Sequence, residues 1–477
     1  MVFGIVKKQN EESTVVVYHS SKGMNDYREN YLLRDPVKKA AWKLVCPTVI
    51  GMFISSLYAF CNYIHIGKLS SNESLMLGTL SAVSPIDQGC INGLSSMVVL
   101  GSSVLLSQLI GRGSLKEGDH LVGNALMLQL IGYGIVLILL YPLLPSVLPF
   151  LTGDGEMFTE ALSYSQFLVV CSVVSFLSSC LNGLIQNQGS AGVCCVISLM
   201  SCGMNILLNI IFIRGYGLGV KGVVLSSTFA AGCSLLLSFL YLQSSFSAVH
   251  FHSSSLSLQW SLCRSVFLMG FPGLITSLVR SFGSFLSNHL LSHFSHSSQE
   301  GLMLLSCWGM LQKCAAVGMI PLLAFSQGMI PLLACTYGSR QYKRYSQCMK
   351  LFMRVLFVIA CVMESVMIVS SSFIGSFLFS EPVFREFFSG GLRWMISSLL
   401  LDGFSFGVLT MLQSIGKGLQ AGIVLLIRES LLLCLQGVLS YRFDSYWGFV
   451  YAYPLSSIVT CLVCSCLYYW HYQIIAG

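Results

Sequence analysis

Charged side chains are scarce in this chain of 477 residues. Asp, Glu, Lys and Arg together make up 9% of it, against about a quarter of a typical soluble domain. Hydrophobic residues make up 55%, and the mean hydropathy is +0.75. Most of the chain therefore cannot face water, which excludes a soluble globular protein and predicts one that crosses a membrane many times.

The sequence also lacks the motifs of nucleotide and metal chemistry. It contains no G-x-x-x-x-G-K-[ST] phosphate loop, and no polar segment is long enough for a separate nucleotide-binding domain. Its 19 cysteines lie mostly within apolar runs, and no Cys-x-x-Cys pair recurs with metal-site spacing. We therefore expect no resident cofactor, no enzymatic activity and no direct use of ATP, so that energy would come from a proton or sodium ion gradient.

Twelve apolar runs of about 20 residues or more are present, and each is long enough to cross about 30 Å of hydrocarbon. They lie near residues 44 to 66, 78 to 110, 121 to 150, 161 to 185, 192 to 213, 221 to 243, 262 to 292, 302 to 336, 348 to 375, 392 to 414, 420 to 441 and 446 to 473. A lipid-facing backbone must satisfy its own hydrogen bonds, so these runs are expected to be helices. The predicted fold class is an all-α membrane protein with about 12 transmembrane helices.

The chain contains an internal repeat. LIQNQGSAG begins at residue 184 and MLQSIGKG at residue 411, while GSSVLLSQLIGRGSLK begins at residue 101 and GMIPLLACTYGSRQYK at residue 328. Both offsets are 227 residues (411 − 184 and 328 − 101). The repeat predicts two pseudo-symmetric six-helix lobes, an N-lobe over residues 41–260 and a C-lobe over residues 261–477.

Positive charges predict the orientation. Residues 1–40 are polar and lack the apolar segment of a secretory signal, so we interpret them as a solvated arm. Together with Lys43, this arm and the even-numbered loops hold 16 Lys and Arg residues, against six in the odd-numbered loops. Both termini are therefore predicted to be cytoplasmic, in the cell inner membrane. The net charge of +7 follows from this asymmetry and needs no nucleic-acid partner.

Polar residues inside apolar runs are candidates for a binding site, because each is unfavourable in lipid. The N-lobe runs contain four such amides: Asn62, Asn182, Asn205 and Asn209. We predict that these amides converge on one water-accessible pocket. The alternative is that they only form hydrogen bonds between neighbouring helices.

Charged residues inside the runs are the second group of candidates. They are Asp87, Arg280, Lys313, Glu364 and Asp402. We predict that Asp402 is an ion-dependent switch with Arg280 as its counter-charge, the alternative being a static buried ion pair. Arg428 is expected to extend to the cytoplasmic interface, where it pairs with the adjacent Glu429.

Several segments resemble the multidrug and toxic compound extrusion (MATE) family of secondary transporters. The resemblance covers residues 40 to 475 and rests on the repeated turns, on MNILLNIIFIRGYGLGVKGVVLSS and on PLLAFSQGMIPLLACTYGSRQYKR. It implies two six-helix lobes around a central cleft that opens to either side of the membrane in turn. It also implies export of a small organic substrate in exchange for protons or sodium ions, by a chain that contacts membrane lipids and that we expect to be a monomer.

The chain departs from the family pattern at three positions. Many members carry aspartate at the positions of Asn62 and Asn209, and one branch carries glutamate at the position of Arg280. These differences leave two alternatives open. A lipid-linked sugar flippase would use Arg280 and Lys313 to bind a pyrophosphate, whereas a membrane-embedded enzyme would use His65, His289 or His293 as a base. The enzyme is disfavoured, because no nucleophile or metal partner recurs near these histidines.

Overall fold

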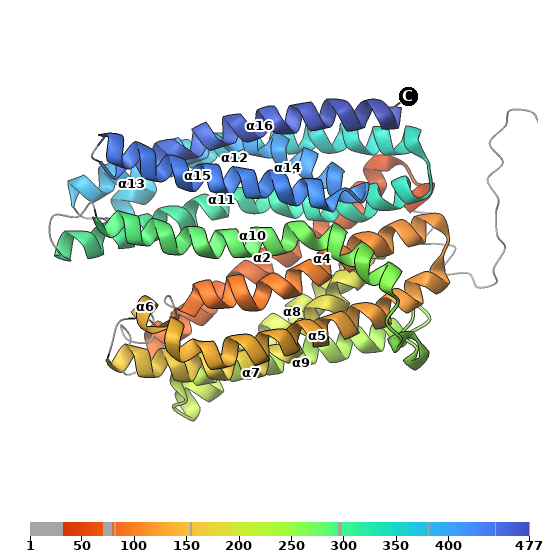
Figure 1. Cartoon of the computed structure of the whole chain (residues 1–477), viewed down its shortest axis with the longest axis horizontal. Helices are drawn as coiled ribbons and strands as arrows, with labels where there is room; N and C mark the ends of the chain where they lie inside the picture. Colours follow the sequence, from red (N-terminus) through yellow and green to blue (C-terminus); the bar gives the residue numbers. More distant parts are fainter. Residues whose placement is uncertain are drawn as a thin grey trace, which may run out of the picture.

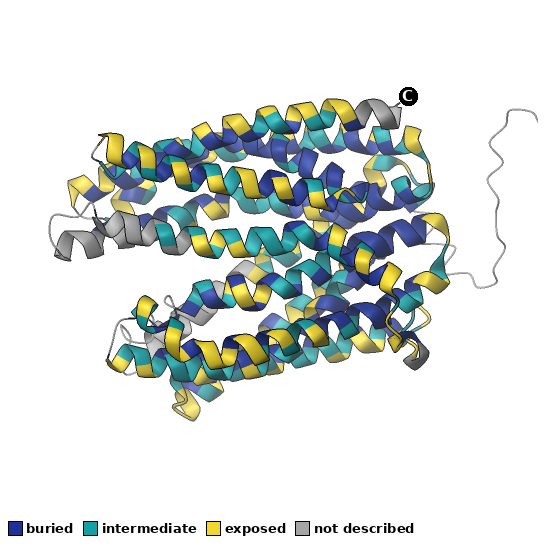
Figure 2. Ribbon diagram, in the orientation of Figure 1, coloured by how far each residue is buried: buried dark blue, intermediate teal, exposed yellow. Residues whose placement is uncertain are grey.

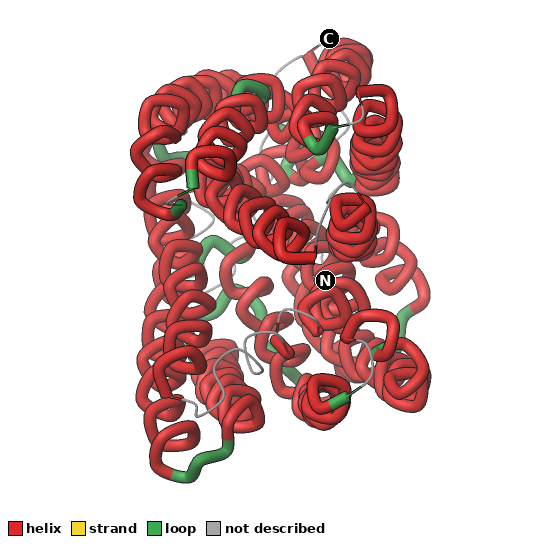
Figure 3. Tube along the Cα trace, turned by 90° about the vertical axis from the view of Figure 1, so that its left-hand side faces the viewer, coloured by secondary structure: helices red, strands yellow, loops and turns green. Residues whose placement is uncertain are grey.

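The computed structural model describes residues 32–69, 79–80, 83–152, 155–293, 298–379, 381–443 and 445–476. Every regular element in these ranges is a helix, and Figure 3 shows the helices joined by short loops. The expected arm, residues 1–40, lies mostly outside the described residues. The side chains of Asn62, His65, His289 and His293 are also outside them.

The helices follow the apolar runs. In the N-lobe they are α2 (Val37–Leu69), α4 (Asn92–Arg112) with the π-helical turn η1 (Asp87–Ile91) before it, α5 (Leu115–Val147), α6 (Pro149–Thr152), α7 (Glu156–Asn187), α8 (Ala191–Asn209) with the π-helical turn η2 (Ile210–Gly215) after it, and α9 (Gly219–Gln243). In the C-lobe they are α10 (Trp260–His293), α11 (Ser298–Gly338), α12 (Tyr342–Leu378), α13 (Pro382–Ile396), α14 (Leu399–Ser414), α15 (Gly418–Phe443) and α16 (Trp447–Ala476). A 3₁₀ turn, η3 (Ser253–Leu256), follows α9 and packs against α5 of the N-lobe.

Ten helices in the described residues are long and apolar enough to span a membrane. The pair α13 and α14 is bent by 41° at its break, and counting it as one broken span gives eleven. The 33-residue helix α2 occupies the first apolar run and completes the set of twelve. The predicted all-α membrane protein with two six-helix lobes is confirmed, and the chain crosses the membrane many times.

Helix boundaries repeat between the lobes at the spacing found in the sequence. Helices α5 and α12 begin at residues 115 and 342, and α8 and α15 begin at residues 191 and 418, both 227 apart (342 − 115 and 418 − 191). Gly189 and Gly416 follow α7 and α14 with φ of 95° and 81°. Only glycine adopts this left-handed conformation without strain, which explains why both turns have glycine there.

The lobes meet through closely packed glycines at one end of the molecule. A Cβ on Gly111 of α4 would lie 2.1 Å from the carbonyl oxygen of Cys335, and a Cβ on Gly338 of α11 would lie 2.3 Å from that of Gln108. Because Cys335 is also 227 residues after Gln108 (335 − 108), the same contact occurs twice around a pseudo-two-fold axis. Figure 1 shows the two halves as layers that approach each other at the end carrying the C-terminus.

The pattern of exposed and buried side chains fits a protein surrounded by lipid. Large apolar side chains on the outer faces are exposed, for example Phe373 and Phe377 of α12 at 75% and 82%. Such faces suit lipid contact. In Figure 2 the buried residues gather where the two halves meet, so the core lies within and between the lobes.

Candidate functional site

The N-lobe contains a cavity of about 400 Å³ between η1, α4, α7 and α9. Its walls combine apolar side chains with the rings of Tyr164 and Phe176 and with several serine and threonine hydroxyls. Asp87 is the one charged residue among those that line it. Apolar and polar side chains thus line the cavity in similar numbers, and such a mixture suits an organic molecule that carries polar groups.

Asp87 is held in place by a local hydrogen-bond pair. It is the first residue of η1, and the side-chain amide of Asn92 donates to its carboxylate Oδ1 and to its backbone carbonyl, both at 3.1 Å. A π-helical turn widens the helix by one residue and frequently marks a functional position. The turn and the amide together present a fixed carboxylate at the cavity wall.

Two of the candidate amides lie against that wall. Asn205 and Asn209 of α8 are completely buried, and the Asn209 amide donates to Asn205 Oδ1 at 3.1 Å. Ser226 of α9 donates its hydroxyl to Asn209 Oδ1, while Asn205 donates to Ser227 at 3.3 Å. Ser227 also lines the cavity, so this amide cluster supports one of its walls.

Asn182 does not join the other amides. On α7 it donates to Ser234 of α9 at 2.7 Å and to the carbonyl of Ser178 at 3.0 Å, two helical turns from the Asn205 cluster along α9. Asn182, Asn205 and Asn209 are absent from the residues lining the cavity. In this structure these three amides connect helices, and the convergence of all four amides on one water-accessible pocket stays a prediction.

The C-lobe contains a buried ion pair. Asp402 lies in the first turn of α14, and its carboxylate Oδ1 is 3.0 Å from Nη2 of Arg428 on α15. The hydroxyl of Ser457 on α16 donates to the same oxygen at 2.9 Å. Arg428 also lies 3.5 Å from the carboxylate of its neighbour Glu429, and with the two side chains 12% and 28% exposed this pair is deeper than the expected interfacial one.

The counter-charge of Asp402 differs from the predicted one. Arg280 is exposed on α10 and takes part in none of the ion pairs found among the described residues. The side chain of Arg428 is only 12% exposed, because the residue lies 10 positions into α15 (428 − 418) and reaches the depth of the α14 N-terminus. Its expected extension to the interface is therefore also wrong.

Glu364 and Lys313 occupy different surroundings. The carboxylate of Glu364 on α12 accepts the backbone N–H of Leu400 at 3.2 Å, which caps the start of α14 at the break in this span. Lys313 is exposed on α11. The break was missed in the sequence, although the adjacent Ser397 and Ser398 are a pair of the type found at helix kinks.

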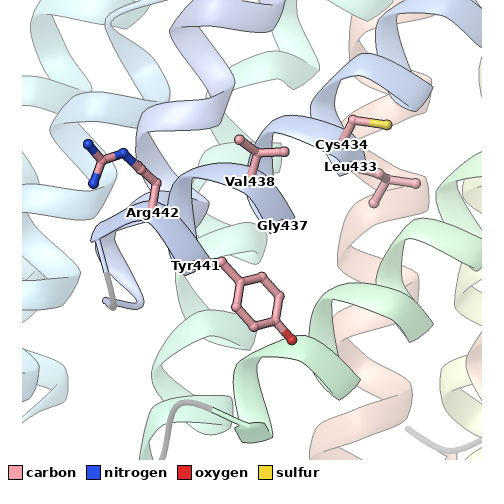
Figure 4. A pocket seen from close by; sticks show the side chains of 6 residues that line it. All are labelled: Leu433, Cys434, Gly437, Val438, Tyr441 and Arg442. Carbon is pink, nitrogen blue, oxygen red and sulfur yellow. The ribbon is translucent and has the colours of Figure 1, made fainter.

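A shallow apolar groove runs along the C-terminal half of α15. It is lined by Leu433, Cys434, Gly437, Val438, Tyr441 and Arg442, and Figure 4 shows all six on this helix. Its lining brings together no cluster of polar groups. The N-lobe cavity is therefore the better candidate for a substrate site.

Comparison with known proteins identifies related sequences. The family model described as MatE matches residues 47–211 and 272–435, one segment in each lobe. The multidrug export protein MepA of Staphylococcus aureus is 21% identical over 444 residues, covering 92% of this chain and 96% of its own length. The protein of the same name from Staphylococcus haemolyticus is 20% identical over 420 residues, covering 88% and 91%.

Solved structures share the fold. An outward-facing multidrug resistance MATE family transporter of the MOP superfamily has a TM-score of 0.83 at 20% identity, covering 94% of this chain and 98% of that one. A MOP superfamily transporter from Pyrococcus furiosus, described by a reverse polarity of its binding pocket, gives the same values. At this identity the likeness establishes the arrangement of helices.

Proposed function

The chain belongs to the MatE family, and from this premise we propose that it exports organic compounds in exchange for protons or sodium ions by alternating access. Related proteins of similar length are named multidrug export proteins. In this proposal the chain is a transporter and not an enzyme, and the coupling ion takes the place of a cofactor.

The observation that carries the proposal is the N-lobe cavity with Asp87 in its wall. A volume of about 400 Å³ lies within the usual range for small-molecule sites. The single carboxylate favours a positively charged substrate or ion, and aromatic rings such as Tyr164 and Phe176 also attract cations. Asp87 is therefore the residue that we expect a cationic substrate and the coupling ion to share.

The cellular setting belongs to the same proposal. The charge asymmetry supports an inner-membrane protein with residues 1–40 as a cytoplasmic arm and both termini in the cytoplasm. Residues 41–260 and 261–477 are the moving lobes, and the repeated helix boundaries support this division. Membrane lipids and a small organic substrate are the expected partners of a monomer, without nucleic acid.

Transport by proteoliposomes tests the proposal. The purified protein is expected to move a cationic dye only under an imposed proton or sodium gradient, each applied separately. Asp87→Asn should reduce this transport at least about tenfold, because a charge-assisted contact contributes roughly 1.5–3 kcal/mol. Glu156→Gln, which changes an exposed acid at the start of α7, is the matched control and should transport normally.

Two results would contradict this assignment. Full gradient-driven transport by Asp87→Asn would show that the coupling residue lies elsewhere. Movement of a labelled lipid-linked sugar by a protein that moves no dye would favour a flippase, and Arg280 and Lys313 would then be the residues to replace.

A further inference from the structure

We propose that Arg428 is a built-in cation that fills an acidic site in the C-lobe, and that removing its guanidinium creates a site for a free cation. Export and ion coupling have been assigned to the N-lobe cavity. The C-lobe ion pair has no role in that assignment. Its geometry shows that the Arg428 guanidinium occupies the site beside Asp402.

The oxygens around Asp402 form a set of ligands suited to a cation. The Ser457 hydroxyl lies 2.9 Å from Oδ1, the Ser398 hydroxyl lies 3.4 Å from Oδ2, and Glu429 supplies a second carboxylate 3.5 Å from Nη1 of Arg428. Carboxylate and hydroxyl oxygens are the ligands that hard cations prefer. In the native protein the Arg428 guanidinium occupies this position.

Burial makes a cation necessary at this site. The side chains of Asp402 and Arg428 are 7% and 12% exposed. An ionised carboxylate at this depth is stable only with a positive charge beside it, because the uncompensated ion would be strongly unfavourable.

The contact depends on charge more than on the shape of the guanidinium. Nη2 makes a single close approach to Asp402, and Nε is buried without an acceptor among the described residues. A guanidinium selected for its shape would instead make a two-pronged contact with the carboxylate. Cζ of Arg428 also lies 6.0 Å from the centre of the Phe406 ring, a cation–π contact that depends on positive charge and not on the guanidinium shape.

The native C-lobe should therefore need no free cation. Sodium and choline should support the stability of the wild-type protein equally at the same ionic strength. Any sodium dependence of transport would then originate outside this pair. Arg428→Ala would leave Asp402 and Glu429 without their common partner and make the C-lobe dependent on a cation from solution.

Thermal unfolding of the purified full chain in detergent tests this inference. The melting temperature is measured in choline, sodium and methylguanidinium chloride at equal ionic strength. Arg428→Ala should melt lower than the wild type in choline and recover by several degrees, saturably, in methylguanidinium or sodium. The matched control Arg442→Ala removes an exposed arginine from the same helix and should respond like the wild type.

A second variant separates charge from packing. Arg428→Ala combined with Asp402→Asn removes both charges and should melt higher than Arg428→Ala in choline, with no response to either cation. Equal melting of Arg428→Ala in all three salts would overturn the inference. So would a wild-type sodium response that Asp402→Asn abolishes, because a free cation would then bind beside Arg428.

The double variant also decides the case in which Arg428→Ala fails to fold. A folded double variant would show that the unpaired carboxylate caused the failure, as the inference requires. Failure of both would mean that Arg428 acts through packing and would overturn it. None of these measurements involves transport, so their outcome is independent of whether the protein exports organic compounds.

Discussion

Buried polar side chains fix the position of the N-lobe cavity wall. Asn205 and Asn209 are shielded from solvent and from lipid, and each finds its partner on the neighbouring helix α9. A polar group in such surroundings is stable only when it is hydrogen-bonded. The two amides therefore determine the rotation of α8 against α9, which places Ser227 at the cavity.

Asn209→Ala is expected to destabilise the protein by about 1–3 kcal/mol, the usual range for leaving a buried partner unsatisfied. Asn205 Oδ1 would lose its donor, and the Ser226 hydroxyl would keep only the backbone carbonyl of Val223 as an acceptor. Reversible unfolding in detergent, followed by circular dichroism, measures the change. Leu207→Ala on the same helix removes an exposed side chain and should have a much smaller effect. Equal losses for the two variants would show that the amide contributes no specific stability.

The C-lobe pair shows the limit of sequence reasoning at the residue scale. The sequence identified Asp402 correctly as a charge inside a span, and the structure buries it. It failed to identify Arg428 as the partner, because pairing depends on the tilt and rotation of α14 against α15. Periodicity within one helix contains no such information. The π-helical turn that positions Asp87 could not be predicted from the sequence either, because no residue type marks its place.

The sequence predicts where each helix lies along the chain far better than it predicts which helices pack against each other. Each apolar run became one helix or one bent pair, since run length and hydropathy alone decide which segments span a bilayer. The repeat was also readable, because Gly189 and Gly416 adopt a conformation that other residues rarely tolerate. The break between α13 and α14 was missed, because its capping group, Glu364, comes from another helix.

The close contact of α4 with α11 predicts an effect of adding single methyl groups. Gly111→Ala or Gly338→Ala would place a Cβ within 2.1 or 2.3 Å of a backbone carbonyl oxygen. Since backbone atoms cannot rotate away, the lobes must shift apart locally, and the melting temperature should fall by several degrees.

Gly134→Ala on α5 is the control for this pair. Nothing lies within 4 Å of its added Cβ, and alanine favours helix over glycine by about 1 kcal/mol. This variant should melt at or slightly above the wild-type temperature. If Gly111→Ala and Gly338→Ala melted at the same temperature as Gly134→Ala, the two helices would not pack as described.

At the scale of the whole molecule, specific contacts hold the lobes together at the end that carries the C-terminus (Figure 1). The side-chain amide of Gln108 in the N-lobe donates to the carbonyl of Ser414 in the C-lobe at 2.8 Å. Nearby, Arg344 of α12 donates to the carbonyls of Leu32 and Asp35, at 2.8 Å and 2.6 Å, just before α2. Alternating access requires these contacts to separate during each cycle.

A reversible cross-link between the lobes should therefore stop transport. The 19 native cysteines are first replaced, and Gln108→Cys with Ser414→Cys is then joined by a short, cleavable bifunctional reagent. Joining them prevents the lobes from separating at this end, so dye transport in proteoliposomes should fall at least about tenfold, which corresponds to an increase of about 1.4 kcal/mol or more in the activation free energy. Cleaving the reagent should restore it.

The repeat supplies a closely matched control for this experiment. Ser107 of α4 donates its hydroxyl to the carbonyl of Asn187 at 2.7 Å, within the N-lobe. Asn187 precedes Ser414 by 227 residues (414 − 187), so the second contact resembles the first but joins two helices of one lobe. Linking Ser107→Cys to Asn187→Cys should leave transport unchanged, because the lobe moves as one body. Undiminished transport with Gln108→Cys and Ser414→Cys fully linked would contradict alternating access through this interface.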